Sequence, residues 1–173
     1  MIGNDIVDLA KAKRDTFIFR PRYLDKLCSR EEVNLVRSSS NSIQTFWRLW
    51  TMKETAYKAY QRQFSFGAKY NPFAFSSQLI DEEVGIVSYQ NHTLITRSFK
   101  TDKFMYSEVS HSEVHNTFFG STAAFLSHLK TEFQLAFPPI VSTSVEGLPI
   151  LKLNQDSIPF SKTHHGHFQA FQY

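Results

Sequence analysis

Apolar and polar residues alternate along this chain with the two spacings that distinguish helices from strands. A short β-branched, apolar run over residues 2–9 predicts a buried strand. A helix is predicted over residues 43–63, where apolar side chains recur at roughly helical spacing: Phe46, Leu49, Trp50, Tyr57 and Tyr60. Two further helices are expected over residues 23–37 and 121–134, the first with a Ser-x-x-Glu capping box.

Turn-forming residues and short alternating runs fill the segments between these helices. The serine-rich run 38–42 predicts a loop whose last serine can cap the following helix. Gly, Pro and Asn mark residues 64–77 as a second loop. A β-meander follows, with strands expected at about residues 84–89, 93–99 and 103–110.

The C-terminal part is expected to contain a few short strands. Pro138 and Pro139 are predicted to end the last helix, and two or three strands should follow them. Helices packed on a largely antiparallel sheet define an α+β fold. With 173 residues, the chain is long enough to bury one sizeable core, so we expect a single domain over residues 1–173.

Composition narrows the choice of compartment and partner. Cys28 is the one cysteine, which excludes an intrachain disulfide and favours a reducing compartment. There is neither a recognisable signal peptide nor an apolar run of the roughly 18 residues that a membrane helix needs, so a cytoplasmic protein without membrane attachment is expected. The net charge of +3 is too small to indicate nucleic-acid binding. Basic residues concentrate in the N-terminal third, which suits an acidic protein or a phosphorylated cofactor.

The segment from Trp50 to Ala59 holds the most informative pair of charges. Glu54 and Lys58 are four residues apart and share one face of the predicted helix. The carboxylate could ligate a hard cation, and the ammonium could meet phosphate charge. A solvated surface ion pair is the alternative, because such pairs are common on exposed helices.

Two carboxylates interrupt the N-terminal apolar strand. Asp5 and Asp8 lie within or next to a run that should be buried, where a carboxylate is costly unless it is paired or bound to a metal. Spacing alone leaves two interpretations of Asp5 open, metal binding and capping of the strand end.

A third polar cluster lies near the C-terminus, between Phe160 and Phe168. Hydroxyl, ammonium and imidazole groups gather there and could bind phosphate, or could form a polar turn between two strands. A transition-metal site formed by His164, His165 and His167 is less favoured, because adjacent strand residues such as His164 and His165 point to opposite faces. His111 and His115 could clamp a metal if that segment were helical, but other ligands are missing nearby.

Together these motifs resemble the 4′-phosphopantetheinyl transferase superfamily. The resemblance rests on three patterns in order: Gly-x-Asp-Ile-Val-acid-Leu, Trp-x-x-Lys-Glu-x-x-x-Lys and a terminal Ser-x-Thr-His. An arginine-led segment from Arg22 to Glu32 is also similar. The pattern is closest to the single-subdomain branch, which includes the holo-acyl-carrier-protein synthases of fatty acid biosynthesis. It covers roughly residues 1–62 and 145–173, whereas 64–120 looks inserted.

The resemblance implies a transferase fold and an activity that uses Mg²⁺ and coenzyme A. It implies that 4′-phosphopantetheine is moved to a serine of an acyl or peptidyl carrier protein. Asp5 and Glu54 would ligate the metal, Glu54 would also act as base, and Lys58 would neutralise the pyrophosphate. The remaining roles are coenzyme A binding by Ser161, Thr163 and His164, and carrier binding by Arg14 and Arg22.

A homo-oligomer is also plausible, since short members of this branch often build the site between subunits. Two other classes stay open. One is a non-catalytic module of the same fold that binds a carrier protein or coenzyme A. The other is a basic RNA-binding α+β domain, which rests on charge alone.

Overall fold

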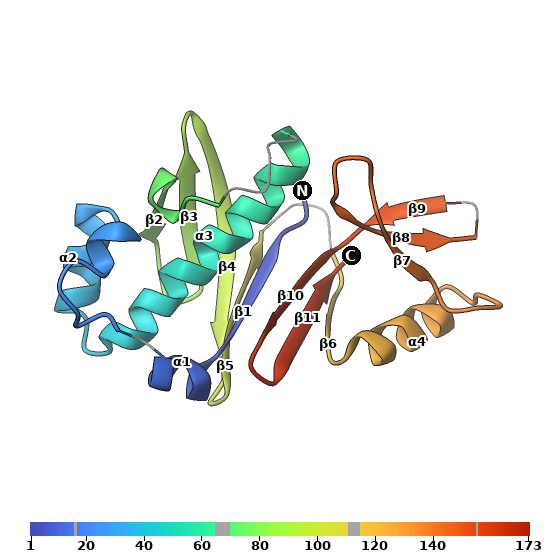
Figure 1. Ribbon diagram of the computed structural model, residues 1–173, viewed down its shortest axis with the longest axis horizontal. Helices are drawn as coiled ribbons and strands as arrows, with labels where there is room; N and C mark the ends of the chain where they lie inside the picture. Colours follow the sequence, from blue (N-terminus) through green and yellow to red (C-terminus); the bar gives the residue numbers. More distant parts are fainter. Residues whose placement is uncertain (16, 65–69, 111–114, 155) are drawn as a thin grey trace.

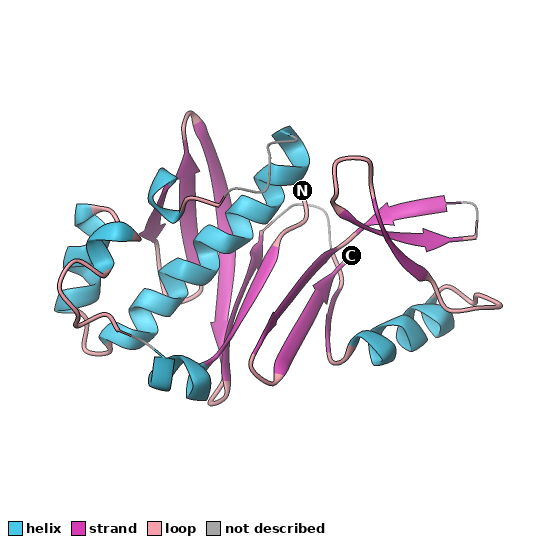
Figure 2. Ribbon diagram, in the orientation of Figure 1, coloured by secondary structure: helices cyan, strands magenta, loops and turns pink. Residues whose placement is uncertain are grey.

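The structure is a computed structural model that combines four α-helices with antiparallel sheets, counted over the part of the chain it describes. It describes residues 1–15, 17–64, 70–110, 115–154 and 156–173. Figure 1 shows one large sheet crossed by a long helix, with smaller sheets beside it, and Figure 2 separates helices from strands. The predicted α+β class is confirmed.

The large sheet has five strands in the order β1-β5-β4-β3-β2, and every neighbouring pair is antiparallel. Its strands are β1 (Asn4–Asp8), β2 (Phe75–Leu79), β3 (Val84–Tyr89), β4 (His92–Lys100) and β5 (Phe104–Val109). The predicted N-terminal strand and the three-stranded meander are therefore confirmed. All five residues of β1 are buried, including both aspartates, so this strand carries charge into the interior.

Helix α3 (Ser42–Phe64) lies across this sheet (Figure 1), as the helical spacing predicted. Its apolar side packs on the sheet through Met52, Ala56 and Tyr60, all of which are buried. Helix α2 (Arg30–Ser38) covers the first half of α3, and its predicted capping box is present: the Ser29 hydroxyl accepts from the Glu32 amide, and the Glu32 carboxylate accepts from the Ser29 amide.

The C-terminal part forms two three-stranded sheets and one helix. One sheet has the order β10-β11-β6 and the other β7-β8-β9. The elements are β6 (Thr117–Phe119), α4 (Thr122–Glu132), β7 (Ile140–Thr143), β8 (Pro149–Leu153), β9 (Asp156–Pro159), β10 (Ser161–His165) and β11 (Phe168–Gln172). A separate apolar core lies under α4, where the rings of Phe125 and Phe171 stack at a centroid distance of 4.2 Å. Figure 1 shows the β10–β11 hairpin beside β1.

Several local expectations need correction. Helix α1 (Leu9–Asp15) was not predicted, and β2 lies partly in the expected 64–77 loop. Helix α4 ends at Glu132, well before the two prolines. The side chain of Asn41, rather than a serine, caps α3, because its Oδ1 accepts from the Gln44 amide at 3.1 Å. These differences concern short, polar segments where turn chemistry outweighs periodicity.

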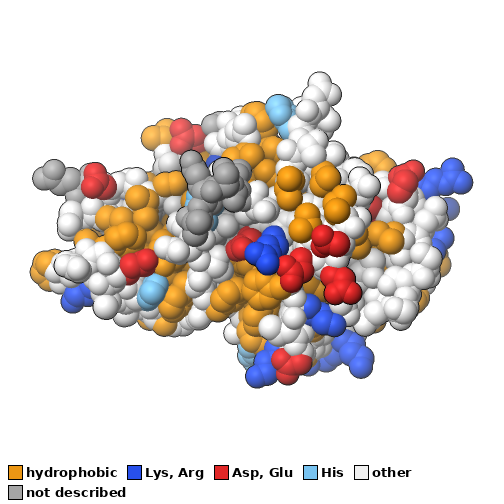
Figure 3. Space-filling view, turned by 180° about the vertical axis from the view of Figure 1, so that it is seen from behind, with side chains coloured by type: hydrophobic (Ala, Val, Ile, Leu, Met, Phe, Trp, Pro, Cys, Tyr) orange, Lys and Arg blue, Asp and Glu red, His pale blue; other side chains and the backbone are white. Residues whose placement is uncertain are grey.

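The face of the large sheet away from α3 is exposed along β4, whereas at the other end of the sheet Ile6 of β1 and Tyr106 of β5 are buried against Ala170 of β11. Along β4, Leu94, Thr96 and Ser98 are buried against the helix side, and the alternate positions are exposed. Figure 3, the view from behind, shows apolar, acidic and basic side chains mixed over this side of the molecule. Among the described residues, the structure has no helix long and apolar enough to cross a membrane.

Candidate active site

The site lies at the edge of β1 that faces away from β5. Three polar main-chain groups of β1 point to this edge, and side chains from distant elements bind each of them. The Asn4 carbonyl accepts from Lys58 Nζ at 2.8 Å. The Ile6 amide donates to Thr163 Oγ1 at 3.2 Å, and the Asp8 amide donates to His165 Nδ1 at 2.9 Å. Side chains of α3 and β10 thus replace a neighbouring strand, which fixes their positions relative to Asp5.

Asp5 is the centre of this arrangement, with an exposed fraction of only 7%. Its Oδ1 accepts from Lys58 Nζ at 3.0 Å and from Thr163 Oγ1 at 2.8 Å. The lysine is 53 positions and the threonine 158 positions from Asp5 along the chain. The structure therefore brings together a residue from each of the three polar motifs: Asp5, Lys58 and Thr163.

Glu54 completes the acidic part of the site from one helical turn before Lys58. The side chain is half-buried, and burial together with the nearby charge of Asp5 raises its pKa to about 7, although Lys58 partly opposes this shift. Its carboxylate has no hydrogen-bond partner among the residues that the structure describes. A carboxylate held in this way, beside a second one, favours a cation as its ligand.

A cavity of about 410 Å³ opens over these groups. Asp5, Glu54, Lys58 and Thr163 line one part of it, and two tryptophans of α3, Trp47 and Trp50, supply an apolar wall. The two indole rings meet edge to face, with centroids 6.3 Å apart. A pocket with an apolar wall and a few convergent charges is typical of a small-molecule site.

A buried ion pair anchors the helix that carries Glu54. Lys53 Nζ lies 2.7 Å from Glu32 Oε2, and both side chains are at most 1% exposed. The ammonium also donates to the carbonyls of Leu27 and Pro72, while Glu32 accepts from the Ser77 amide. All three ammonium hydrogens therefore have an acceptor, which is what makes a buried lysine tolerable. The pair fixes α3 against α2 and β2, and hence fixes the helix face that bears Glu54.

The other residues singled out in the sequence lie at varying distances from this cavity. Ser161 is buried on the same face of β10 as Thr163 but does not line the cavity. His164 borders the cavity but is exposed. Arg14, in the last turn of α1, and Arg22, which has a positive φ of 62°, are both exposed on the surface.

Asp8 acts as a cap. Its Oδ1 accepts from the Lys11 amide in the first turn of α1, and its Oδ2 accepts from the His167 amide at 3.2 Å. These backbone hydrogen bonds lower the pKa of Asp8 despite its burial. Both carboxylate oxygens are therefore engaged with main-chain amides, which leaves Asp5 and Glu54 as the acids that face the cavity.

The donor set fits a hard divalent cation held jointly with its substrate. Among the described residues there is no group of three or more His, Cys, Asp or Glu side chains that could hold a metal. Two carboxylates in oxygen-rich surroundings match Mg²⁺, which keeps several waters and is commonly bound by one or two carboxylates plus substrate phosphates. His111, considered above as a metal ligand, lies outside the described residues.

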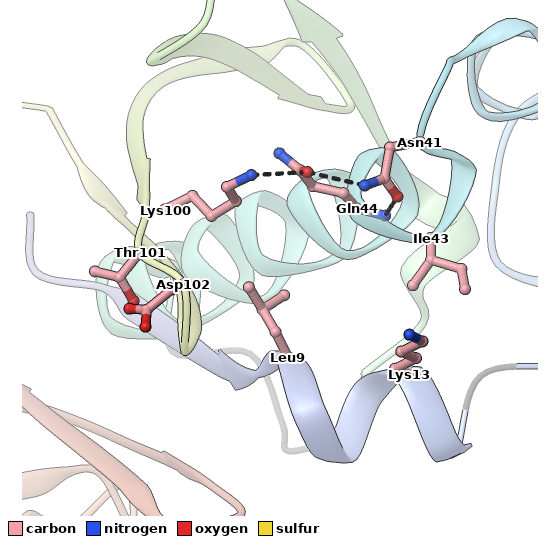
Figure 4. Close-up of a pocket in the computed structure, with 8 residues that line it drawn as sticks. All are labelled: Leu9, Lys13, Asn41, Ile43, Gln44, Lys100, Thr101 and Asp102. Atoms are coloured by element: carbon pink, nitrogen blue, oxygen red, sulfur yellow. Dashed lines mark hydrogen bonds between the residues drawn. The ribbon is translucent and has the colours of Figure 1, made fainter.

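A second cavity, of about 480 Å³, lies between α1, the start of α3 and the β4–β5 turn (Figure 4). Leu9 and Ile43 give it an apolar floor, and Lys13 and Lys100 border it. Lys100 Nζ donates to Gln44 Oε1 at 3.0 Å, as the figure shows. This cavity contains none of the predicted catalytic or metal-binding residues.

A protein-family model matches most of the chain. The chain belongs to the 4′-phosphopantetheinyl transferase superfamily, whose family model matches residues 1–123. The match runs through residues 64–120, which the motif comparison treated as an insertion but which supply most of the large sheet. Searches of curated proteins and of solved structures returned no match.

Sequence reasoning missed two contributors to the site. They are the Asn4 carbonyl, which binds Lys58, and the side chain of Trp47, which lines the cavity. His165, which also lines the cavity, belongs to the C-terminal cluster considered above for phosphate binding. The hydrogen bond to the Asn4 carbonyl could not be predicted, because every residue type has a main-chain carbonyl. Trp47 could have been found from its position, since it lies two helical turns before Glu54 on the same helix.

Proposed function

We propose that this protein transfers 4′-phosphopantetheine from coenzyme A to a serine of an acyl or peptidyl carrier protein, with release of 3′,5′-ADP. The single observation that supports this best is the convergence of Asp5, Glu54 and Lys58 on one cavity. A non-catalytic module has no use for two carboxylates in close electrostatic contact, because their repulsion destabilises the fold.

In this proposal Asp5 and Glu54 would hold Mg²⁺, a cation that one or two carboxylates commonly bind together with substrate phosphates. When bound, the cation neutralises the two carboxylates and part of the pyrophosphate charge. Lys58 orients Asp5 through their 3.0 Å ion pair. Two of its three ammonium hydrogens are used by Asn4 and Asp5, so one is left to meet a phosphate oxygen.

The chemical step is a phosphoryl transfer between two oxygens. The serine oxygen of the carrier bonds to the β-phosphorus of coenzyme A, and the bond from that phosphorus to the bridging oxygen breaks. Glu54 is the candidate base for the serine proton. Lys58 stabilises the charge that grows on the departing 3′,5′-ADP.

Carrier binding is proposed for the basic surface around α1. Lys13 and Arg14 form the last turn of this helix, and Lys100 lies across the second cavity from it (Figure 4). An acidic carrier helix would find an apolar floor bordered by lysines there. Arg22, which is also exposed, is proposed as a second basic contact for the carrier. Such complementarity chiefly raises the rate of encounter and fades with salt.

Two isosteric substitutions test the proposed metal and base roles. Asp5→Asn and Glu54→Gln should each abolish transfer to an apo-carrier at limiting Mg²⁺ while circular dichroism shows an unchanged fold. The amides keep the shape of the side chains but lose the charge that binds the cation. Exposed Glu82→Gln is the matched control, expected to turn over normally. Normal turnover by either site variant would refute the shared assignment.

A further inference from the structure

The β10–β11 hairpin presents alternate side chains of β10 to β1. Ser161, Thr163 and His165 face inward, whereas Lys162 and His164 are exposed. Thr163 reaches Asp5, and His165, two residues further on, reaches the Asp8 amide. The motif resemblance points to His164 as a coenzyme A ligand, but the neighbouring histidine is the one that makes a defined contact at the edge of β1.

This contact determines where the proton of His165 lies. A backbone amide can only donate, so the Nδ1 atom that accepts from Asp8 at 2.9 Å must carry a lone pair. The imidazole is then neutral, with its proton on Nε2. Burial, and to a smaller degree the charge of Lys11, lowers the pKa of His165, in agreement with a neutral ring.

The imidazole ring of His165 lies where a substrate in the cavity could reach it. His165 lines the same cavity as Glu54 and Lys58, and its ring is tilted 32° to that of Trp47 at a centroid distance of 6.0 Å. Its Nε2 has no hydrogen-bond partner among the residues that the structure describes. An oriented N–H group without a protein acceptor, in a cavity that Lys58 and Lys162 also line, can donate to an anionic oxygen.

We propose that His165 is a neutral N–H donor to a phosphate oxygen of coenzyme A, held in a single tautomer by the main-chain amide of Asp8. The inference rests on the proposed function, since it names a further contact to the same substrate. Asp8 then acts as a positioning residue: its carboxylate fixes α1 and the His167 amide, while its own amide fixes the imidazole.

The conformation of the turn after His165 allows the imidazole to reach the Asp8 amide. Gly166 adopts a positive φ of 58°, which favours glycine, and a Cβ atom at that position would collide with the Asp8 carboxylate. The tip of the hairpin can therefore approach Asp8 closely, and the approach places the imidazole nitrogen on the Asp8 amide.

The tautomer can be measured directly in the unmodified protein. We would label histidine with ¹⁵N and record long-range ¹H–¹⁵N correlation spectra at pH 7, with and without coenzyme A. His165→Phe assigns the His165 signals by their loss. We expect the Nε2–H pattern for His165, and a change in its Nε2 shift when coenzyme A binds. An Nδ1–H or doubly protonated ring would overturn the proposal, and so would an Nε2 chemical shift that does not change when coenzyme A is added.

Calorimetry on variants gives the second readout. His165→Phe keeps a ring against Trp47 but loses both nitrogens, and should weaken coenzyme A binding about 10-fold. His165→Gln, which can still accept at one atom and donate at another, should lose less. His167→Gln is the control, because His167 contacts Asp8 through its main chain and its side chain is exposed. Unchanged affinity in His165→Phe would overturn the proposal.

Failure of the His165 proposal and failure of the proposed transferase activity give different results. If a carrier is modified normally but His165→Phe binds coenzyme A as tightly as wild type, the His165 inference alone fails. If coenzyme A shifts the His165 signal and His165→Phe weakens binding, yet no carrier is ever modified, the contact stands and the proposed transfer fails.

Discussion

Glu54→Gln should make the metal-free protein more stable at alkaline pH while it removes activity. A carboxyl group whose pKa is raised by folding binds its proton more tightly in the folded state than in the unfolded chain. Its contribution is therefore favourable at low pH and is lost as the pH rises from 4.5 through about 7. Above pH 7 the wild-type protein keeps a half-buried carboxylate charged beside Asp5, and the glutamine variant does not.

The magnitude follows from the size of the pKa shift. A rise from 4.5 to about 7 corresponds to a loss of about 3 kcal/mol in the free energy of unfolding of the wild type by pH 8. For a chain of this length, that equals a difference in Tm of about 6–12 °C between variant and wild type. The difference should shrink to less than about 1 kcal/mol at pH 5, where Glu54 is mostly protonated.

The assay is urea unfolding of the metal-free protein at pH 5 and at pH 8, in EDTA, followed by circular dichroism. Glu82→Gln removes an exposed carboxylate and serves as the control, with an expected change within about 0.5 kcal/mol at both pH values. Added Mg²⁺ should stabilise the wild type at pH 8 more than it stabilises Glu54→Gln. If Glu54→Gln is no more stable than the wild type at pH 8, burial and the charge of Asp5 do not destabilise the Glu54 carboxylate, and the reasoning is refuted.

Three further outcomes follow from the site and its supports. Lys58→Ala should lower kcat by about 100-fold with a smaller loss of coenzyme A affinity, because the ammonium stabilises the departing phosphate more than the bound one. Steady-state kinetics measures both quantities, and an unchanged kcat would mean that Lys58 is only a structural partner of Asp5. Arg14→Glu or Arg22→Glu should weaken carrier binding more than coenzyme A binding, and the effect should decrease as salt shortens the Debye length below about 8 Å. If carrier affinity responds neither to these charge reversals nor to salt, this surface has another role. Lys53→Met should destabilise the fold by about 3–5 kcal/mol, because Glu32 would stay buried without a counter-charge; the double variant with Glu32→Gln should recover part of that loss in denaturant titrations.

The sequence predicted the elements with strong periodicity. Helix α3 and the β3–β5 meander lie close to where their apolar spacing placed them, and the capping box of α2 was visible in Ser29 and Glu32. Helix α1 was not predicted, because it has seven residues, four of them charged, and buries only Ala12. A helix this short takes its stability from the Asp8 cap and from the sheet rather than from its own pattern.

The candidate site was predicted in its residues but less well in its contacts. Asp5 stood out because a carboxylate in a buried strand is costly, and Glu54 and Lys58 stood out because their spacing places them on one helix face. The contact between Asp5 and Thr163 joins residues 158 positions apart, and nothing in either segment specifies that pairing. Likewise, Lys53 looks like any polar helix residue until Glu32 and two backbone carbonyls are brought to it.

The measurement that tests the central claim most directly is the mass of a carrier protein after incubation. Purified protein, coenzyme A and Mg²⁺ would be combined with a panel of apo-carrier proteins, and intact masses would be recorded with the Asp5→Asn variant in parallel. We expect at least one carrier to gain the mass of a 4′-phosphopantetheine group on its serine, with no gain in the variant. Unmodified carriers throughout, together with intact binding of coenzyme A or carrier, would contradict the transferase assignment and favour a non-catalytic binding module of the same fold.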